Sequence, residues 1–218
     1  MYNIIMVCRT YTLAEEIYNT LTHAVGSLLC AFFFGMLVEK ACLPSVSSTT
    51  TVGYCIFGVS SMFAYIASSL YHAVSHIESK RKLKMFDHIA IYFLITGTYI
   101  PLILSAVIPT NPVLGWSFLG LQVVCAVGGV LYKVFSESRY SKISVILYCM
   151  LGWSAVVILK PLLSNLSSNT IFWLVAGGVA FSAGVPFYIM KQYKWTHTIW
   201  HIFVLIGSIC HYMMMFKI

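Results

Sequence analysis

Long stretches without any formally charged residue constrain the fold of this chain more than any other feature. Residues 41–77, 88–132 and 195–216 contain no Asp, Glu, Lys or Arg. An α-helix rises about 1.5 Å per residue and needs about 20 mostly apolar residues to cross the hydrocarbon core of a bilayer. Only 9% of the residues are charged, whereas soluble domains carry about 25%. The sequence therefore predicts an all-α integral membrane protein.

Seven spans result when the apolar stretches are divided at their turn signals. The polar stretch 45–51 separates two spans, and residues 108–112, with two prolines, mark a tight hairpin between two others. The expected spans are approximately 18–38, 52–72, 88–107, 113–133, 143–159, 170–190 and 196–216. The fifth span is short because Lys142 and Lys160 bound it. We expect residues 1–218 to form a single seven-transmembrane helix bundle.

The distribution of Lys and Arg predicts how the bundle is oriented. Cytoplasmic connections carry an excess of these residues. Ten of the 13 occur at the N-terminus or after the second, fourth and sixth spans, namely Arg9, Lys80, Arg81, Lys82, Lys84, Lys133, Arg139, Lys142, Lys191 and Lys194. The opposite side has Lys40, Lys160 and Lys217. The N-terminus is therefore expected in the cytoplasm and the C-terminus outside. Membrane orientation also explains the formal charge of +7 without a nucleic-acid partner.

A pair of histidines at the start of the seventh span carries the strongest functional signal. His197 and His201 are four residues apart, which places both imidazoles on one face of a helix, one turn apart. Two neutral imidazoles in this arrangement can bind one metal ion. Because ionisable groups inside a membrane are costly, they are candidates for a functional site.

Three further residues are expected at the same cytoplasmic depth. His72 ends the second span, Ser68 lies one turn earlier on the same helical face, and Asp87 precedes the third span. Together with the histidine pair, His72 would supply three nitrogen ligands and leave one tetrahedral position for water, as in catalytic zinc sites. Asp87 could orient that water or act as a general base, and Ser68 could hold water or substrate.

These three residues also have plainer interpretations. His72 could be an interfacial residue at the end of a span. Asp87 could pair with Lys84 or cap the N-terminus of the third helix. Ser68 could be one of the small residues that let membrane helices pack closely.

The other histidines are expected outside the metal centre. His211 lies about 15 Å beyond the histidine pair along the helix axis, so it cannot join the same site. His76 and His88 flank the basic segment and are expected to contact solvent. His23 is expected to hydrogen-bond Asn19, one turn earlier.

Three separated motifs point to a known family. They are Glu16-x-x-Asn19-x-x-Thr22-His23; Ser68-x-x-Tyr71-His72, followed by Asp87-His88 and Gly97-Thr98-Tyr99-Ile100-Pro101; and His197-x-x-x-His201, followed by His211. In this order, across residues 16–211, they resemble the haemolysin III branch of the progestin and adipoQ receptor family. The resemblance implies a heptahelical bundle that binds zinc on the cytoplasmic side. The implied ligands are His72, His197 and His201, with Ser68 and Asp87 near the metal-bound water.

The resemblance leaves three functions open. The family is grouped with ceramidase-like membrane hydrolases, which implies a zinc-dependent hydrolase of lipid amides or esters. The branch is named for haemolysis, but a pore needs polar rings at several depths, and the middle of these spans is almost wholly apolar. The third function is a membrane-homeostasis sensor with structural zinc, in which the basic segment 77–86 contacts a partner or anionic headgroups. In each case membrane lipids are the expected substrate or ligand, and the oligomeric state stays open.

The resemblance also suggests a location. Animal receptors of the family have a long cytoplasmic extension before the first span, and the present sequence has only a short segment there. This difference favours a bacterial homologue in the inner membrane.

Overall fold

The computed structural model describes residues 11–135, 142–190 and 192–218, and all regular structure within these ranges is helical. Seven helical segments are long and apolar enough to cross a membrane. The helices are α1 (Leu13–Ala41), α2 (Ser48–Ala73), α3 (Ile77–Leu102), α4 (Pro112–Phe135), α5 (Lys142–Gly152), α6 (Leu159–Asn165), α7 (Ser168–Ile189) and α8 (Thr196–Met215). The π-helical turn η1 (Ile103–Val107) extends α3, and the 3₁₀ turn η2 (Ser154–Ile158) joins α5 to α6. The predicted seven-span, all-α membrane fold is confirmed.

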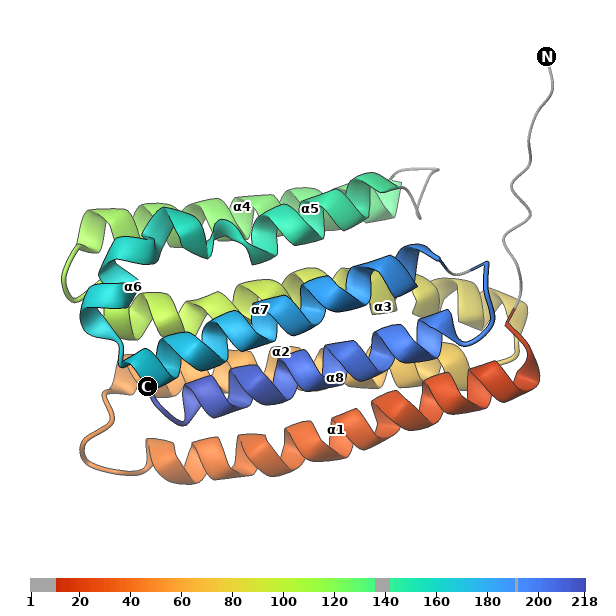
Figure 1. The fold of residues 1–218 in the computed structure, drawn as a ribbon, viewed down its shortest axis with the longest axis horizontal. Coiled ribbons are helices and arrows are strands. Elements are labelled where there is room, and N and C mark those ends of the chain that lie inside the picture. Colours follow the sequence, from red (N-terminus) through yellow and green to blue (C-terminus); the bar gives the residue numbers. More distant parts are fainter. Residues whose placement is uncertain (1–10, 136–141, 191) are drawn as a thin grey trace, which may run out of the picture.

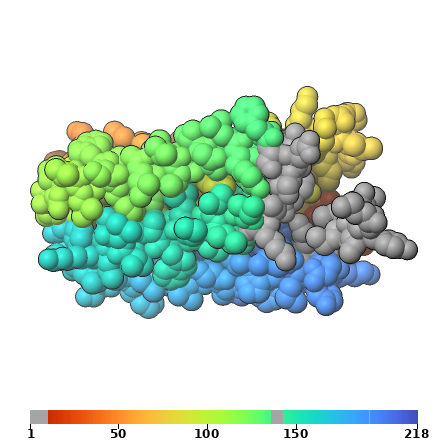
Figure 2. Space-filling model, turned by 90° about the horizontal axis from the view of Figure 1, so that it is seen from above, coloured from red at the N-terminus to blue at the C-terminus, as the bar shows by residue number. Residues whose placement is uncertain are grey.

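The helices lie side by side along the long axis of the molecule (Figure 1). Helix α2 packs against α1 and α3, while α8 packs against α7 and α1. The core between the inner helices α2, α3 and α8 is filled by large side chains that are at most 3% exposed: Tyr54, Phe57, Tyr65, Tyr99, Leu102, Ile103, Tyr212 and Met214. Helices α4, α5 and α7 lie on the face seen in Figure 2, and the start of α3 projects at one end of it.

Helix α3 begins earlier than the sequence analysis expected. Its first turns contain the basic segment 77–86, which was expected to be a loop before a span starting at residue 88. The segment is rich in Lys, Arg, Glu and Met, which favour helix, and the His76 side chain caps it by accepting from the Ser79 N–H at 3.4 Å. The interpretation of Asp87 as a helix cap was therefore wrong, because Asp87 lies within the helix.

The fifth span is longer than predicted and is interrupted. It runs from Ile143 to Asn165, past the expected boundary at Lys160, whose exposed side chain can extend toward the membrane surface. At the interruption, the Tyr99 hydroxyl donates to the Gly152 carbonyl at 2.5 Å and accepts from the Ala155 N–H at 2.9 Å. Side-chain partners of this kind make a broken helix tolerable at membrane depth.

The ends of the helices divide into two groups. The start of α1 and the α2–α3 and α7–α8 connections lie at one end of the bundle, and the α1–α2 connection and the end of α8 lie at the other (Figure 1). This arrangement agrees with the two sides assigned from the sequence. Arg9, Arg139 and Lys191, which contributed to the orientation prediction, lie outside the described residues. The cytoplasmic N-terminus and the single-domain organisation stay predictions.

Candidate metal centre

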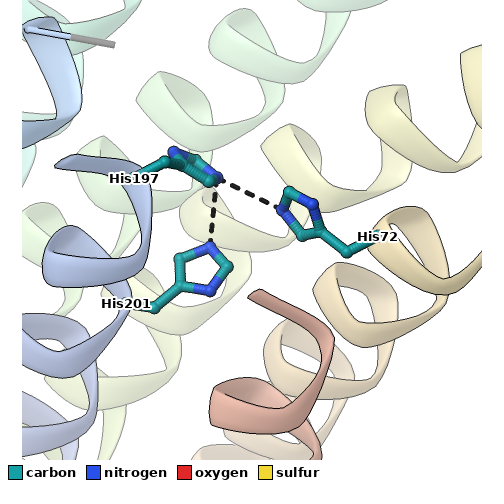
Figure 3. A group of neighbouring side chains, drawn as sticks. All are labelled: His72, His197 and His201. Atoms are coloured by element: carbon teal, nitrogen blue, oxygen red, sulfur yellow. Dashed lines mark hydrogen bonds between the residues drawn. The ribbon is translucent and has the colours of Figure 1, made fainter. Parts of the chain in front are cut away.

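Three buried histidines from two helices meet at the end of the bundle where α1 begins. His72 lies in the last turn of α2, and His197 and His201 lie in the first two turns of α8. The His197 Nε2 atom is 3.2 Å from His72 Nε2 and 3.1 Å from His201 Nε2 (Figure 3). One nitrogen from each ring lies within 4.8 Å of the other two. The residues that the sequence analysis selected as ligands are therefore brought together.

The spacing of these nitrogens suits a tetrahedral metal ion. Zinc binds imidazole nitrogen at about 2.0–2.1 Å, so two ligands at tetrahedral corners stand roughly 3.3 Å apart. The contacts of 3.1 and 3.2 Å are close to that value.

The outer nitrogens of two rings are held by acceptors. His72 Nδ1 is 2.6 Å from a Glu16 carboxylate oxygen. His201 Nδ1 is 3.2 Å from the Asn19 carbonyl oxygen and 3.1 Å from Thr22 Oγ1. The Thr22 hydroxyl donates to that same carbonyl at 3.0 Å, so its oxygen is free to accept from the imidazole. Both Nδ1 atoms therefore carry a proton, and both Nε2 atoms present a lone pair to the centre.

The two lone pairs point at His197, which can donate from Nε2 to only one of them. If it does, its Nδ1 has no proton, and that atom is buried without a hydrogen-bond partner among the described residues. If it does not, three lone pairs converge. A bound cation would remove this repulsion, and oriented Nδ1–H groups are the usual outer partners of metal-binding histidines. The donor set therefore fits a metal ion.

Helix α1 fixes where α8 begins. The Thr12 and Glu15 side chains form a capping box at the start of α1. The Glu15 carboxylate also accepts from the backbone N–H of Trp195 at 2.9 Å, and Trp195 has a left-handed φ of 67° in the turn before α8. One turn farther along, the Asn19 side chain accepts from the Thr198 hydroxyl at 2.6 Å. These contacts set the depth of the first α8 turns and of the ligands on them.

Ser68 and Asp87 line a small cavity beside the histidines. The cavity has a volume of about 40 Å³, and its walls also include His197 and His201. Ser68 Oγ is buried and has no hydrogen-bond partner in the described part of the chain. An Asp87 carboxylate oxygen is 3.3 Å from His88 Nδ1. A volume of this size can hold water, and the proposed roles of Ser68 and Asp87 stay predictions.

His88 is buried, contrary to the expectation that it contacts solvent. Its Nδ1 donates to the Lys84 carbonyl at 2.7 Å, and its Nε2 lies 3.3 Å from the Tyr188 hydroxyl. The reason is that α3 extends through residues 77–86, which carries His88 into the bundle instead of leaving it at a helix start. His76, by contrast, is exposed as expected.

His23 does not bond Asn19 as predicted. Its ring stacks on His201 with centroids 3.6 Å apart, and both of its nitrogens are buried without a partner among the residues described. His23 also lines the 40 Å³ cavity. His211 lies outside the centre, as expected, and packs against Phe181 of α7 with ring centroids 5.4 Å apart.

The residues that hydrogen-bond the histidine rings were expected only as parts of a family motif, with Asn19 as a partner of His23, and not as partners of His72 and His201. Glu16, Asn19 and Thr22 recur at intervals of three, which places them along one side of a helix. That pattern was a usable signal, but the first span was expected to start at residue 18, so Glu16 was left outside it. Polar residues on one stripe of an apolar span indicate a contact with other polar groups.

A larger open groove lies on the α1 side of His72. Its volume is about 380 Å³, and it is lined by Leu13, Glu16, Ile17, Thr20, Leu21, His72, Ala73, Ser75 and Lys80. The exposed fractions of Leu13 and Leu21, 77% and 53%, show that its apolar wall faces outward. We call it the α1–α2 groove.

The fold and the histidine centre define a heptahelical membrane protein with a candidate metal site at one end. Residues 11–212 match the family described as haemolysin-III related, and the chain belongs to this family. It is similar to "Hemolysin-3" of Bacillus cereus, with 36% identity over 93% of this chain and 91% of that protein. It is also similar to "Hemolysin-3 homolog" of Bacillus subtilis, with 38% identity over 91% of each chain.

A human protein is a more distant relative. "Monocyte to macrophage differentiation factor" of Homo sapiens is 27% identical over 74% of this chain and 68% of that protein. The human match is consistent with the predicted relation to the progestin and adipoQ receptor family. Family membership and seven apolar spans together make this a multi-pass membrane protein.

Proposed function

We propose that this protein binds one zinc ion through His72, His197 and His201 and hydrolyses an amide or ester bond of a membrane lipid at the cytoplasmic face. The observation that carries the proposal is the convergence of three buried Nε2 atoms while acceptors hold two of the Nδ1 atoms. A zinc ion with three protein ligands supplies Lewis acidity that activates water and polarises a carbonyl group.

The surroundings supply the groups that hydrolysis needs. Asp87 lies on the cavity wall, where its carboxylate can accept a proton from water. The unpartnered Ser68 hydroxyl can hydrogen-bond the polar part of a substrate. The α1–α2 groove gives an acyl chain an apolar surface that leads from the lipid side to His72.

Zinc binding is tested by removing one ligand. His201→Ala should abolish stoichiometric zinc in the purified protein, because two ligands remain and the His201 lone pair is lost. The matched control is His211→Ala, which removes a buried histidine from the same helix but outside the centre, and it should keep one zinc per chain. Metal analysis of both purified variants gives the answer, and full zinc occupancy in His201→Ala would refute the ligand assignment.

Catalysis is tested by Asp87→Asn. This variant should keep zinc and lose hydrolysis of amide or ester lipids by about 10²–10⁴-fold, the usual contribution of general acid–base catalysis. Glu78→Gln, at an exposed carboxylate on the same helix, is the control and should retain activity. Unchanged hydrolysis in a zinc-loaded Asp87→Asn protein would remove Asp87 from the mechanism.

A sensor with structural zinc is the second candidate. The continuity of α3 favours it, because one helix joins the exposed basic segment 77–86 to Asp87 at the cavity. In this case the wild type should hydrolyse none of the amide and ester lipids tested, and Asp87→Asn should change only stability.

A cytolytic pore within one chain is the weakest candidate. The relatives carry the name "Hemolysin-3". Among the described residues, however, the space between α2, α3 and α8 is filled by the aromatic and aliphatic core, whereas a pore needs polar rings at several depths. Haemolysis by such a protein would require lipid damage or oligomers.

A further inference from the structure

Lys80 lies where the helix that carries His72 ends. Its ammonium group donates to the carbonyl oxygens of Tyr71 and Val74, each at 3.1 Å, and reaches the His72 carbonyl at 3.5 Å. The last carbonyls of a helix have no partner within the helix, and a cation there also interacts favourably with the helix dipole. Lys80, in the first turn of α3, therefore closes the C-terminal end of α2.

The same ammonium group holds the carboxylate that orients His72. Lys80 Nζ is 2.9 Å from Glu16 Oε1, and the other Glu16 oxygen is 2.6 Å from His72 Nδ1. The Lys80 and Glu16 side chains are 26% and 18% exposed, and the His72 side chain is fully buried. The three groups form an unbroken chain from the edge of the α1–α2 groove to the metal centre.

We propose that Lys80 is a positioning residue for the metal centre, which acts through Glu16 to fix the orientation of the His72 imidazole. The inference rests on the proposed zinc site. It differs from the sequence expectation, in which Lys80 was one of several interchangeable cations that orient the protein in the membrane.

Its neighbours do not share these contacts. Arg81 pairs with Glu78 at 2.9 Å, and both of those side chains are more than 60% exposed. Lys82 is exposed as well. Exposed ion pairs of this kind contribute little to folding stability. Mutation of a partner that orients a metal ligand, by contrast, typically changes metal affinity by about 10–100-fold.

The sign of the expected effect separates positioning from simple charge. Removing a cation near a divalent metal site would by itself favour metal binding, because like charges repel. A loss of affinity after removal of Lys80 therefore requires loss of geometry. Lys82→Met removes the same charge from the same helical segment and controls for the electrostatic change.

The experiment measures zinc affinity of the full-length protein in detergent by competition with a chromophoric chelator. The wild type should bind one zinc ion. Lys80→Met, which keeps most of the aliphatic side chain, should weaken binding by about 10–100-fold, and Lys82→Met should stay within about twofold of the wild type. If Lys80→Met is not helical, Lys80→Gln takes its place, since glutamine can still donate to α2 carbonyls but carries no charge to hold Glu16.

A double-mutant cycle tests whether Glu16 transmits the effect. Glu16→Gln should weaken zinc binding by itself, and adding Lys80→Met should weaken it little further, because residues that act in one chain are not additive. Fully additive losses would overturn the proposal. So would a Lys80 variant that binds zinc like the wild type but whose metal-free form unfolds earlier, which is the mark of a purely structural role.

The controls separate this inference from the proposed function. A wild type that binds zinc beside an unaffected Lys80→Met refutes only the positioning role. A wild type that binds no zinc refutes the metal site, and the positioning role with it.

Discussion

Asn19 shows how much one polar side chain can determine inside an apolar helix. It is fully buried, its side-chain oxygen accepts from the Thr198 hydroxyl, and its backbone carbonyl faces His201 Nδ1. Asn19 on α1 thus contacts two α8 residues, Thr198 and His201, which lie about one helical turn apart. In a membrane no water replaces a lost hydrogen-bond partner, so these polar groups need their partners within the protein.

Thr198→Val tests the side-chain contact. Valine has nearly the same shape but cannot donate, so the Asn19 oxygen would be left buried without its partner. We expect a destabilisation of about 1–3 kcal/mol, measured by unfolding in detergent, with zinc still bound. Thr51→Val is the control, because the exposed Thr51 hydroxyl donates to the carbonyl of Ser47, the N-cap residue of its own helix. Equal stability of the two variants would contradict the assigned role.

At the residue scale, the three histidines of the candidate centre could be grouped from the sequence, but the residues that hydrogen-bond them could not. The spacing of His197 and His201 and the position of His72 at a span end are local patterns, so helical periodicity and charge bias were enough to group them. Glu16 and Lys80 matter because α1, α2 and α3 meet at one end of the bundle. A contact between residues 64 positions apart leaves no local pattern to read.

At the scale of the elements, number and order were predictable while the ends were not. Hydropathy located seven helices because a span of a given length needs a run of apolar residues. Charged residues were then taken to mark the helix ends. That rule gave wrong boundaries at residues 77–86 and at Lys160, because a helix can continue through charged residues where it emerges from the hydrocarbon core of the bilayer. The break in the helix at Ser154 was not predictable, because it depends on a distant residue. The backbone groups that it frees, on Gly152 and Ala155, hydrogen-bond the Tyr99 hydroxyl of α3.

The close contact between α2 and α3 gives a prediction at this scale. A side chain on Gly53 would place its Cβ 2.7 Å from the Pro101 Cα, and backbone atoms cannot move aside as a side-chain tip can. Gly53→Ala should therefore destabilise the bundle by about 1–3 kcal/mol, seen as a lower unfolding temperature in detergent. Gly128→Ala is the matched control, because nothing lies within 4 Å of its Cβ position. There the helix propensity of alanine should leave stability unchanged or raise it by up to about 1 kcal/mol. A Gly53→Ala protein as stable as Gly128→Ala would show that the two helices separate easily.

At the scale of the whole molecule, polar function is concentrated at one end. The three histidines, the cavity and the basic start of α3 lie where α1 begins. The rest of the described interior is mostly aromatic and aliphatic, and single polar side chains such as Gln122, Ser208 and His211 are buried in it. The α1–α2 groove reaches the site from the side, at His72. Whether that end of the bundle is cytoplasmic depends on the orientation, which the Lys and Arg distribution predicts.

Orientation can be measured with two single-cysteine proteins. Cys42 is exposed in the α1–α2 connection, and Ser75 is exposed in the α2–α3 connection at the opposite end. A protein that keeps only Cys42 should react with a membrane-impermeant thiol reagent on intact cells. A cysteine-free protein with Ser75→Cys should react only after the membrane is opened. The reverse pattern would place the metal centre outside the cell and overturn the cytoplasmic assignment. Cys8, at the expected cytoplasmic N-terminus, lies outside the described residues, so Ser75 is the better probe.

The three histidines proposed as metal ligands come from α2 and α8, which the ribosome produces at different times. A ribosome delivers His72 early, but His197 and His201 emerge only with the last helix. A nascent protein that has inserted six spans offers only one of the three proposed ligands, and one imidazole holds metal only weakly. If these residues bind the metal as proposed, uptake has to wait until α8 is made, and a chain that holds its ion has already brought α8 beside α1. Bound metal would mark a chain whose seventh span is in place, and proteins interrupted before that span would be left without it.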